Sequence, residues 1–335
     1  MHTLQFDYRF EANYDIVFFA HFVPYTYQDL IHYLCKLEGD AEVKKIMRID
    51  YLCNSLGQAP VYGLTITNDL DEQYVGKYKE IFKFQRFEYT KNKIKHKKIK
   101  KDNNPKEETE EGKEAPKDQP GNEKGEKMYK KHIFITSRVH PGESQASHMV
   151  EGMINYLVSD HPEAVEIRSK FVIKIIPMLN PDGVIFGNYR SSLLGVDLNR
   201  RWKKPSKYLH PEIYYAKQII KYFDLKSKQP ECESGGVVLY CDFHGHSKNL
   251  DAFMYSCIDL ADESKAHFNN MVIRATPTAI DRLIPIFNIR ECKFAIEKEK
   301  ENTARIVLFK EFGILSSYTF EVTFFGSEFL RHMKQ

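Results

Sequence analysis

The sequence lacks the features that mark membrane, secreted and disulfide-rich proteins. No stretch approaches the roughly 18 uninterrupted apolar residues of a membrane-spanning helix. The six cysteines form no C-x-x-C pair and no closely spaced framework, so we expect reduced thiols. Residues 1–8 contain neither a basic region nor a long apolar run of the kind that directs secretion. A cytoplasmic location is therefore expected.

Excess charge of one sign is also missing. The formal net charge is only +3, from 49 basic and 46 acidic side chains, so overall electrostatics favours neither nucleic acid nor a membrane surface as a partner. With 335 residues, 42% of them hydrophobic, the chain can bury a sizeable core in one large or two modest domains. No internal repeat is visible. We expect a globular protein with no nucleic-acid or membrane partner.

One stretch departs from this composition. Residues 89–127 begin with a lysine-rich run and continue with glutamate, proline and glycine, so they cannot bury enough apolar area to order themselves. We predict a charged, disordered insertion here. It is either a solvated loop between two core elements or a basic arm for an acidic partner, such as nucleic acid or an acidic protein tail.

Outside the insertion, strand-like and helical patterns alternate. Branched and aromatic residues predict strands at residues 16–23, 47–53, 61–67, 132–136, 171–178, 237–243 and 318–325. Apolar residues at helical spacing predict helices at residues 29–37, 143–158 and 211–223. This alternation predicts an α/β fold with a mixed, mostly parallel sheet between helices.

Three potential metal ligands stand at the ends of two of these strands. His140 and Glu143 lie three residues apart in S-R-V-H-P-G-E, and His244 lies in C-D-F-H-G-H-S. Open α/β sheets place their chemistry past the carboxyl ends of strands. Two imidazoles and one carboxylate form an open, catalytic zinc site with one position left for water. An H-x-x-E pattern also arises by chance, but its place after a strand favours hydrolysis.

Further charged side chains have both a structural and a functional interpretation. Arg190, Asn199 and Arg200 lie close together in sequence, and a guanidinium holds a carboxylate or stabilises an oxyanion, although such a loop also suits a solvated surface. Glu321 stands inside an apolar, alternating run, where a half-buried carboxylate is costly unless it is paired or needed. It is either a structural ion-pair partner or a general base.

In their order along the chain, the motifs H-x-x-E, N-P-D-G, G-N-x-R, D-L-N-R, D-F-H-G-H-S and Y-T-F-E resemble those of the zinc carboxypeptidase superfamily. Segments 18–27, 64–67, 138–143, 242–247 and 298–305 resemble more narrowly the cytosolic carboxypeptidases. Members of that branch remove glutamate from protein C-termini and from polyglutamate branches, notably on tubulin. The resemblance implies an eight-stranded type of sheet. It also implies a remnant of an N-terminal β domain at residues 1–23 and a catalytic domain at 24–335 that the insertion interrupts.

The resemblance also implies roles for these residues. His140, Glu143 and His244 would hold one Zn²⁺, the ligand set of a carboxypeptidase, with His246 a supporting or unrelated histidine. Glu321 takes the position of the general acid and base. Arg190 matches the arginine that polarises the scissile carbonyl in the family. Asn199 and Arg200 match the pair that clamps the terminal carboxylate of the substrate.

An acidic substrate residue requires a basic partner in the specificity pocket. Arg305 lies where the family places a specificity-determining residue, and we predict that it binds the substrate. Lys298 and Lys300 are alternatives, and both suit an exposed charged turn equally well.

The expected protein is thus a zinc-dependent metallocarboxypeptidase that removes C-terminal amino acids, in particular glutamate from tails such as those of polyglutamylated tubulin. Two other functions stay open. A zinc-dependent deacylase of N-acyl acidic amino acids uses the same ligand pattern. An inactive module would instead bind acidic protein tails through Arg190, Arg200 and the insertion, without hydrolysis.

Overall fold

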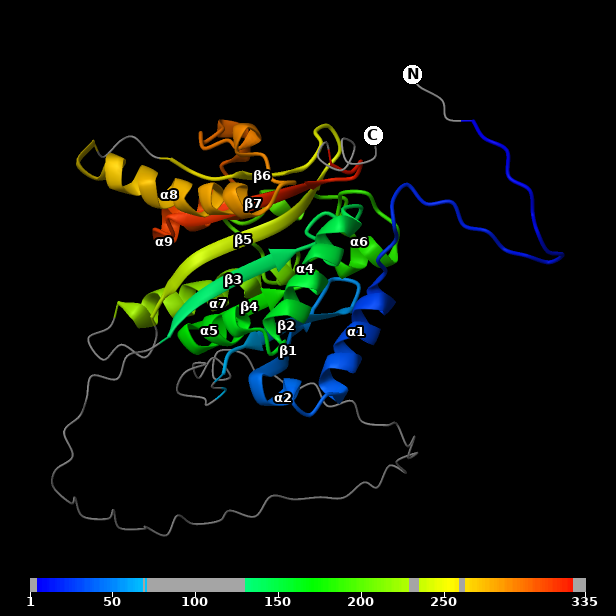
Figure 1. The fold of residues 1–335 in the computed structure, drawn as a ribbon, viewed down its shortest axis with the longest axis horizontal. Coiled ribbons are helices and arrows are strands. Elements are labelled where there is room, and N and C mark those ends of the chain that lie inside the picture. The colour runs from blue at the N-terminus through cyan, green and yellow to red at the C-terminus, as the bar shows by residue number, and fades with distance from the viewer. Residues whose placement is uncertain (1–4, 69, 71–129, 229–234, 259–262, 328–335) are drawn as a thin grey trace, which may run out of the picture.

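The computed structural model describes residues 5–68, 70, 130–228, 235–258 and 263–327, which build one mixed sheet with helices on both faces (Figure 1). The strands are β1 (Met47–Asn54), β2 (Pro60–Ile66), β3 (Lys131–Ser137), β4 (Phe171–Ile176), β5 (Val237–His246), β6 (Ala252–Tyr255) and β7 (Ser316–Thr323). The α-helices are α1 (Tyr27–Gly39), α2 (Val43–Ile46), α4 (Ser144–Leu157), α5 (Pro162–Lys170), α6 (Pro181–Ile185), α7 (Pro211–Ser227), α8 (Glu263–Leu283) and α9 (Ala304–Phe312). Short 3-10 helices are η2 (Leu198–Arg200), η3 (Ile289–Glu291) and η4 (Lys298–Lys300). The insertion predicted at 89–127 lies outside the described residues.

The sheet runs in the order β1-β2-β4-β3-β5-β7-β6. The central pairings β4–β3, β3–β5 and β5–β7 are parallel, and the outer pairings are antiparallel. The prediction of a mixed sheet between helices is confirmed. In the described part of the chain the sheet has seven strands rather than eight, and its parallel part is limited to the four central strands. Because parallel strands end at the same edge, the loops after β3, β5 and β7 meet there.

The two faces of the sheet bury different helices. Ile135 and Ile173 pack with apolar residues of α1 and α4 on one face. Phe134 and Tyr240 pack with α7 and α9 on the other. Neighbouring residues of a strand point to opposite faces, so β3 contributes to both cores. Burial on both faces keeps the central strands fixed at the edge where the predicted ligands stand.

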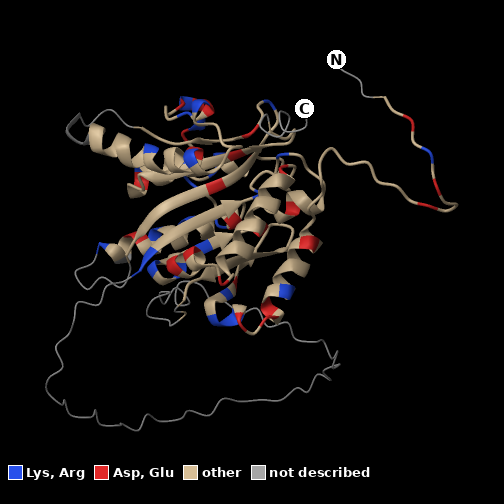
Figure 2. Ribbon diagram, in the orientation of Figure 1, with Lys and Arg blue, Asp and Glu red and all other residues tan. Residues whose placement is uncertain are grey.

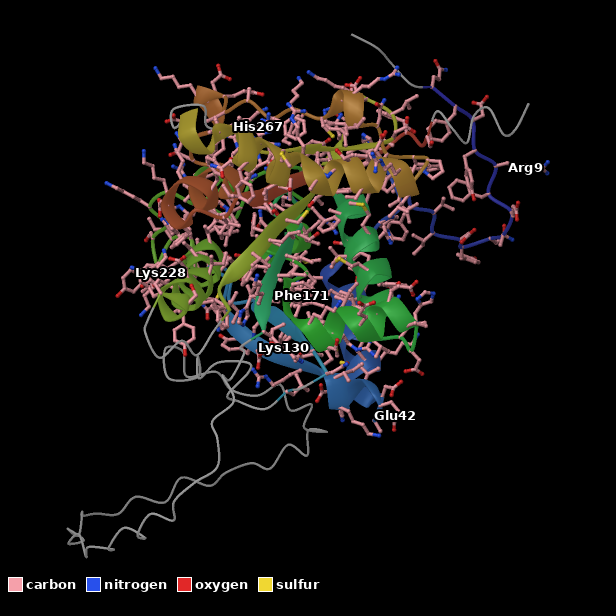
Figure 3. All side chains as sticks on the ribbon, turned by 60° about the vertical axis from the view of Figure 1, so that its left-hand side comes forward. Arg9, Glu42, Lys130, Phe171, Lys228 and His267 are labelled. Carbon is pink, nitrogen blue, oxygen red and sulfur yellow. The ribbon has the colours of Figure 1, made fainter. Side chains whose placement is uncertain are left out.

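The strand predicted at residues 16–23 is wrong. Residues 5–26 have no regular secondary structure, and the first part of this segment runs away from the helices and sheet before the chain returns to the fold ahead of α1 (Figure 1). Arg9, labelled in Figure 3, lies on this segment, away from the core. Ile16 is 76% exposed and Phe18 is 88% exposed. A strand needs a neighbour for its backbone hydrogen bonds, and no described strand pairs with this segment, so its β-propensity was not sufficient.

Six α-helices and strands escaped the sequence patterns, namely α2, α5, α6, α8, α9 and β6. Helix α9 is buried at every position from Ala304 to Phe309, so it shows no amphipathic period. Helix α8 contains Pro277, a residue that normally ends a helix. Strand β6 has only four residues. The sequence signal of each of these elements is weak, because packing against the rest of the fold stabilises them more than their local sequence does.

The surface matches the near-neutral composition. Figure 2 shows basic and acidic residues of both signs spread over the described helices. The five cysteines within the described residues are all free, as expected, and Cys53, Cys241 and Cys257 are buried. Among the described helices, none combines the length and the hydropathy needed to cross a bilayer.

Candidate metal centre and active site

His140, Glu143 and His244 meet at the carboxyl edge of the sheet. His140 and Glu143 lie in the loop between β3 and α4, and His244 lies near the end of β5. The three side chains are buried, and one ligand atom from each lies within 4.8 Å of the others. Glu143 Oε1 is 2.8 Å from His140 Nδ1, and Glu143 Oε2 is 3.0 Å from His244 Nδ1. The structure therefore brings the three predicted ligands together, with both Nδ1 atoms facing the carboxylate.

Each histidine has an aspartate of its own next to Nε2, the ring nitrogen that faces away from Glu143. Asp197 Oδ1 lies 3.2 Å from His140 Nε2, and Asp242 Oδ2 lies 2.8 Å from His244 Nε2. A carboxylate accepts a hydrogen bond, so each contact favours the tautomer with its proton on Nε2. The lone pair on Nδ1 is then available to a metal, and the partner carboxylate strengthens the ligand. Sequence reasoning missed both aspartates, although each stands two residues from a predicted site residue.

The donor set fits a divalent cation. The two Nδ1 atoms lie 3.2 Å apart, and two imidazole lone pairs at this distance repel each other unless a positive charge lies between them. Burial lowers the pKa of His244, but Asp242 and Glu143 outweigh it, so the net shift is upward. The surroundings thus favour positive charge at this point. Two nitrogens and one carboxylate oxygen are ligands that Zn²⁺ prefers.

The strand pattern explains how Asp242 reaches its histidine. Tyr240, Asp242 and His244 alternate along β5 and therefore project from the same face. Asp242 is fully buried and accepts a second hydrogen bond from Thr136 Oγ1 at 2.7 Å, and that hydroxyl lies 2.6 Å from the Tyr240 hydroxyl. Thr136 and Asp242 are register partners in the β3–β5 pair. A continuous buried network thus orients His244.

Glu321 lies directly beside His244 in the parallel pair of β5 and β7. Register partners in a parallel pair project from the same face, so the glutamate shares the face of His244, a potential metal ligand. Burial raises the pKa of Glu321 to about 7, with a further upward contribution from Glu143. No described lysine or arginine forms an ion pair with it. The arrangement therefore favours an acid–base group over a structural ion pair.

Two arginines share Asp197. Arg190 contacts Asp197 Oδ2 with Nε at 3.1 Å and with Nη2 at 2.9 Å, and Arg200 Nη1 lies 3.7 Å from the same oxygen. The Arg190 side chain is 49% exposed and that of Arg200 is 34% exposed. The positive charge of two guanidiniums exceeds the negative charge of one carboxylate. This side of the metal centre therefore attracts an anionic group.

Asn199 is buried, unlike the two partly exposed arginines. It is 5% exposed, and its Oδ1 accepts a hydrogen bond from the Ala304 amide at the start of α9. Its Nδ2 lies 3.4 Å from His244 Nε2. The structure places Asn199, a residue of η2, against both His244 and the start of α9. Its contact with a substrate carboxylate stays a prediction.

Arg305 is buried at the start of α9, at 3% exposure. Its Nη1 donates to the Ser256 carbonyl, and its Nε has no hydrogen-bond partner among the described residues. Its guanidinium lies 5.9 Å from the ring centre of Tyr255, and Lys300 Nζ lies 4.9 Å from the same centre. The structure therefore places Lys300 and Arg305 around the same tyrosine ring, whereas Lys298 is exposed. We call Arg305, Lys300 and Tyr255 the basic cluster.

Other motif residues support the backbone. Asp182 of N-P-D-G accepts hydrogen bonds from Ser55 Oγ at 2.6 Å and from the Gly57 amide at 2.7 Å, which ties α6 to the turn between β1 and β2. His246 Nδ1 accepts from the amides of Lys248 and Asn249 and so shapes the turn after β5. Neither motif residue belongs to the group of potential metal ligands.

Comparisons with known proteins agree with this site. A family model for zinc carboxypeptidases matches residues 40–250. Mouse cytosolic carboxypeptidase 1 is 34% identical over 98% of this chain, which spans only 23% of that relative. Cytosolic carboxypeptidase 2 of Macaca fascicularis is 35% identical over 97% of this chain and is covered to 31%. The chain thus corresponds to less than a third of the length of either relative.

Solved structures share the fold. A metallo-carboxypeptidase from Burkholderia cenocepacia superposes with a TM-score of 0.62 at 20% identity, covering 90% of this chain and 61% of that one. A metallo-carboxypeptidase from Pseudomonas aeruginosa gives a TM-score of 0.58 at 18% identity, with the same two coverages. The match over residues 40–250 includes all three potential ligands. The resemblance seen in the sequence is confirmed, and the chain belongs to the zinc carboxypeptidase family.

Proposed function

We propose that the protein is a zinc-dependent carboxypeptidase that removes C-terminal amino acids by hydrolysis. One observation carries this proposal: His140, Glu143 and His244 converge on one point, and Glu321 projects from the same face beside His244. When bound, Zn²⁺ supplies a Lewis acid that activates water and polarises a carbonyl. This arrangement is chemically complete for peptide hydrolysis without a covalent intermediate.

The residues of the chain perform the remaining steps. Glu321 takes the proton of the attacking water and passes it to the leaving amine, and a pKa of about 7 suits both transfers. Arg190, held on Asp197, stabilises the negative charge that grows on the carbonyl oxygen. The proton leaves water and ends on the amine, so the reaction balances with water as the only co-reactant.

The excess positive charge around Asp197 explains cleavage at chain ends. Arg200, together with Asn199, would bind the terminal carboxylate of the substrate, which supplies the negative charge that two guanidiniums need. An internal peptide bond offers a neutral amide at this position. Such a substrate would leave positive charge unpaired and would bind less well, although water screens part of this difference because both arginines are partly exposed.

The basic cluster supports glutamate as the residue removed. Arg305 is buried, and its Nε has no hydrogen-bond partner among the described residues, so an acidic side chain would supply the missing acceptor. Lys300 adds a second cation on the same tyrosine ring. Together with the names of the relatives, this supports an enzyme of the cytoplasm that shortens acidic protein tails, such as the polyglutamate tails of tubulin. We assign this activity to a catalytic domain at residues 24–335, and we propose that residues 1–23 are a remnant of an N-terminal β domain.

A peptide that ends in several glutamates tests the proposal. Purified protein with Zn²⁺ should shorten it in steps of one glutamate, as followed by mass spectrometry, and a chelator should stop the reaction. A deacylase would leave this peptide intact but release acid from an N-acyl glutamate. A binding module would retain the peptide on a column without shortening it. Either result would refute the carboxypeptidase proposal.

A further inference from the structure

Gln145 is buried behind the metal centre and takes no part in the proposed chemistry. It stands in the first turn of α4, shortly after the ligand Glu143, and is 4% exposed. Its Nε2 donates to the carbonyl of Val322 at 3.2 Å, and Val322 follows Glu321 on β7. One side chain therefore connects the helix that follows a metal ligand to the strand that carries the general base.

Gly245 leaves the space that this contact requires. A Cβ atom at Gly245 would lie 2.0 Å from Gln145 Nε2 and 2.4 Å from Gln145 Cδ, too close for any real side chain. The amide of Gly245 also donates to Glu143 Oε2 at 3.0 Å. Gly245, the residue after His244, thus contacts both the carboxylate of Glu143 and the side chain of Gln145.

The strand register shows what this contact controls. Gly245 and Val322 are partners in the β5–β7 pair, one step beyond the pair formed by His244 and Glu321. Because neighbouring residues of a strand face opposite sides, Gln145 touches both strands from the side opposite the metal ligands. Its amide therefore holds β5 and β7 together just beyond the step that carries ligand and base.

We infer that Gln145 is a positioning residue that sets the separation of Glu321 from His244. The inference rests on the proposed function, since it concerns the general base of that reaction. Its Oε1 is buried without a hydrogen-bond partner among the described residues. An apolar side chain would fill the same space without this cost, so packing alone does not account for an amide here.

Substitution Gln145→Met tests the inference, because it keeps the length of the side chain and removes the donor. Loss of one ordinary hydrogen bond that positions the base should lower kcat about tenfold, while KM, zinc stoichiometry and zinc affinity stay unchanged. The matched control is Gln28→Met, an exposed glutamine in the first turn of α1, which should leave kcat unchanged. An unchanged kcat in Gln145→Met, or a parallel loss of zinc, would overturn the inference.

Two measurements do not depend on activity. In the metal-free protein, Gln145→Met should speed amide hydrogen exchange several-fold in β7 and at the end of β5, and nowhere else. Gly245→Ala should displace the Gln145 side chain from Val322 and so destabilise the wild-type protein more than the Gln145→Ala variant, in which the shorter side chain leaves room for a Cβ. Equal destabilisation in both backgrounds, or unchanged exchange, would refute the proposed contact. If the wild type cleaves no peptide, the proposed function fails, while these results still decide the role of Gln145.

Discussion

Asp242 offers the sharpest test of the metal centre. It is fully buried and accepts hydrogen bonds from His244 Nε2 at 2.8 Å and from Thr136 Oγ1 at 2.7 Å. Substitution Asp242→Asn keeps the shape of the side chain and removes its charge. One amide oxygen can still accept from His244, but the imidazole then loses the negative partner that strengthens it as a ligand.

The expected magnitude follows from these contacts. Loss of a carboxylate that supports a metal-bound histidine typically weakens metal binding by about 10–100-fold, or ~1.4–2.8 kcal/mol. Because Asp242 has no exposed surface, water and salt screen its charge little, so we expect the upper half of this range. His140 keeps its own partner, Asp197, so binding should be weakened rather than abolished.

Competition with a chromophoric chelator at constant pH measures the zinc affinity. The matched control is Asp182→Asn, because Asp182 is also buried and also accepts two hydrogen bonds, from Ser55 and from Gly57. The control should lower the free energy of unfolding and leave zinc affinity unchanged. Zinc affinity within twofold of wild type in Asp242→Asn, or an equal loss in the control, would refute the reasoning.

Three further substitutions extend the test. Glu321→Gln should lower kcat by at least ~100-fold, while the zinc content measured by atomic absorption stays unchanged. If the variant still shortens the peptide at the wild-type rate, Glu321 is not the base. Arg305→Met should lower kcat/KM about tenfold or more for peptides ending in glutamate and little for peptides ending in alanine; equal losses for both would contradict a role in specificity. Burial raises the pKa of Glu212 from 4.5 to about 7. As pH rises through this interval, the Glu212 carboxyl ionises in the unfolded state before it ionises in the folded state, so it lowers the free energy of unfolding. The free energy of unfolding of Glu212→Gln, measured with urea, should therefore match that of the wild type near pH 4 and exceed it by about 3 kcal/mol at pH 8. A gain independent of pH would contradict the pKa assignment.

The convergence of the three potential ligands was predictable because their signal is local. His140 and Glu143 follow one strand closely and His244 lies near the end of another, and a parallel sheet brings such ends to one edge. The strand at residues 16–23 was predicted wrongly for the opposite reason. Its residues favour extended structure, but pairing depends on a neighbour that a local pattern cannot reveal.

Residues that support the ligands were harder to predict, because their roles depend on contacts between distant segments. The role of Asp197 depends on the loop before η2, which folds onto His140. The role of Gln145 depends on the register of β5 and β7. Asn199 was identified by its motif, yet the structure shows a buried link to the first amide of α9. Sequence motifs thus identify the groups that do chemistry more readily than the groups that orient them.

The end of β5 shows why the two kinds of residue occur together. A strand presents alternate residues to opposite faces, so Asp242 and His244 serve the metal centre while Gly245 accommodates the glutamine behind it. A Cβ atom on Gly245 would displace the side chain of Gln145 in the first turn of α4, and α4 begins directly after Glu143. The glycine therefore bears on metal binding without contacting the metal. Gly245→Ala should weaken zinc binding in the wild type and much less in Gln145→Ala, and an equal weakening in both would show that the ligands hold their geometry without this contact.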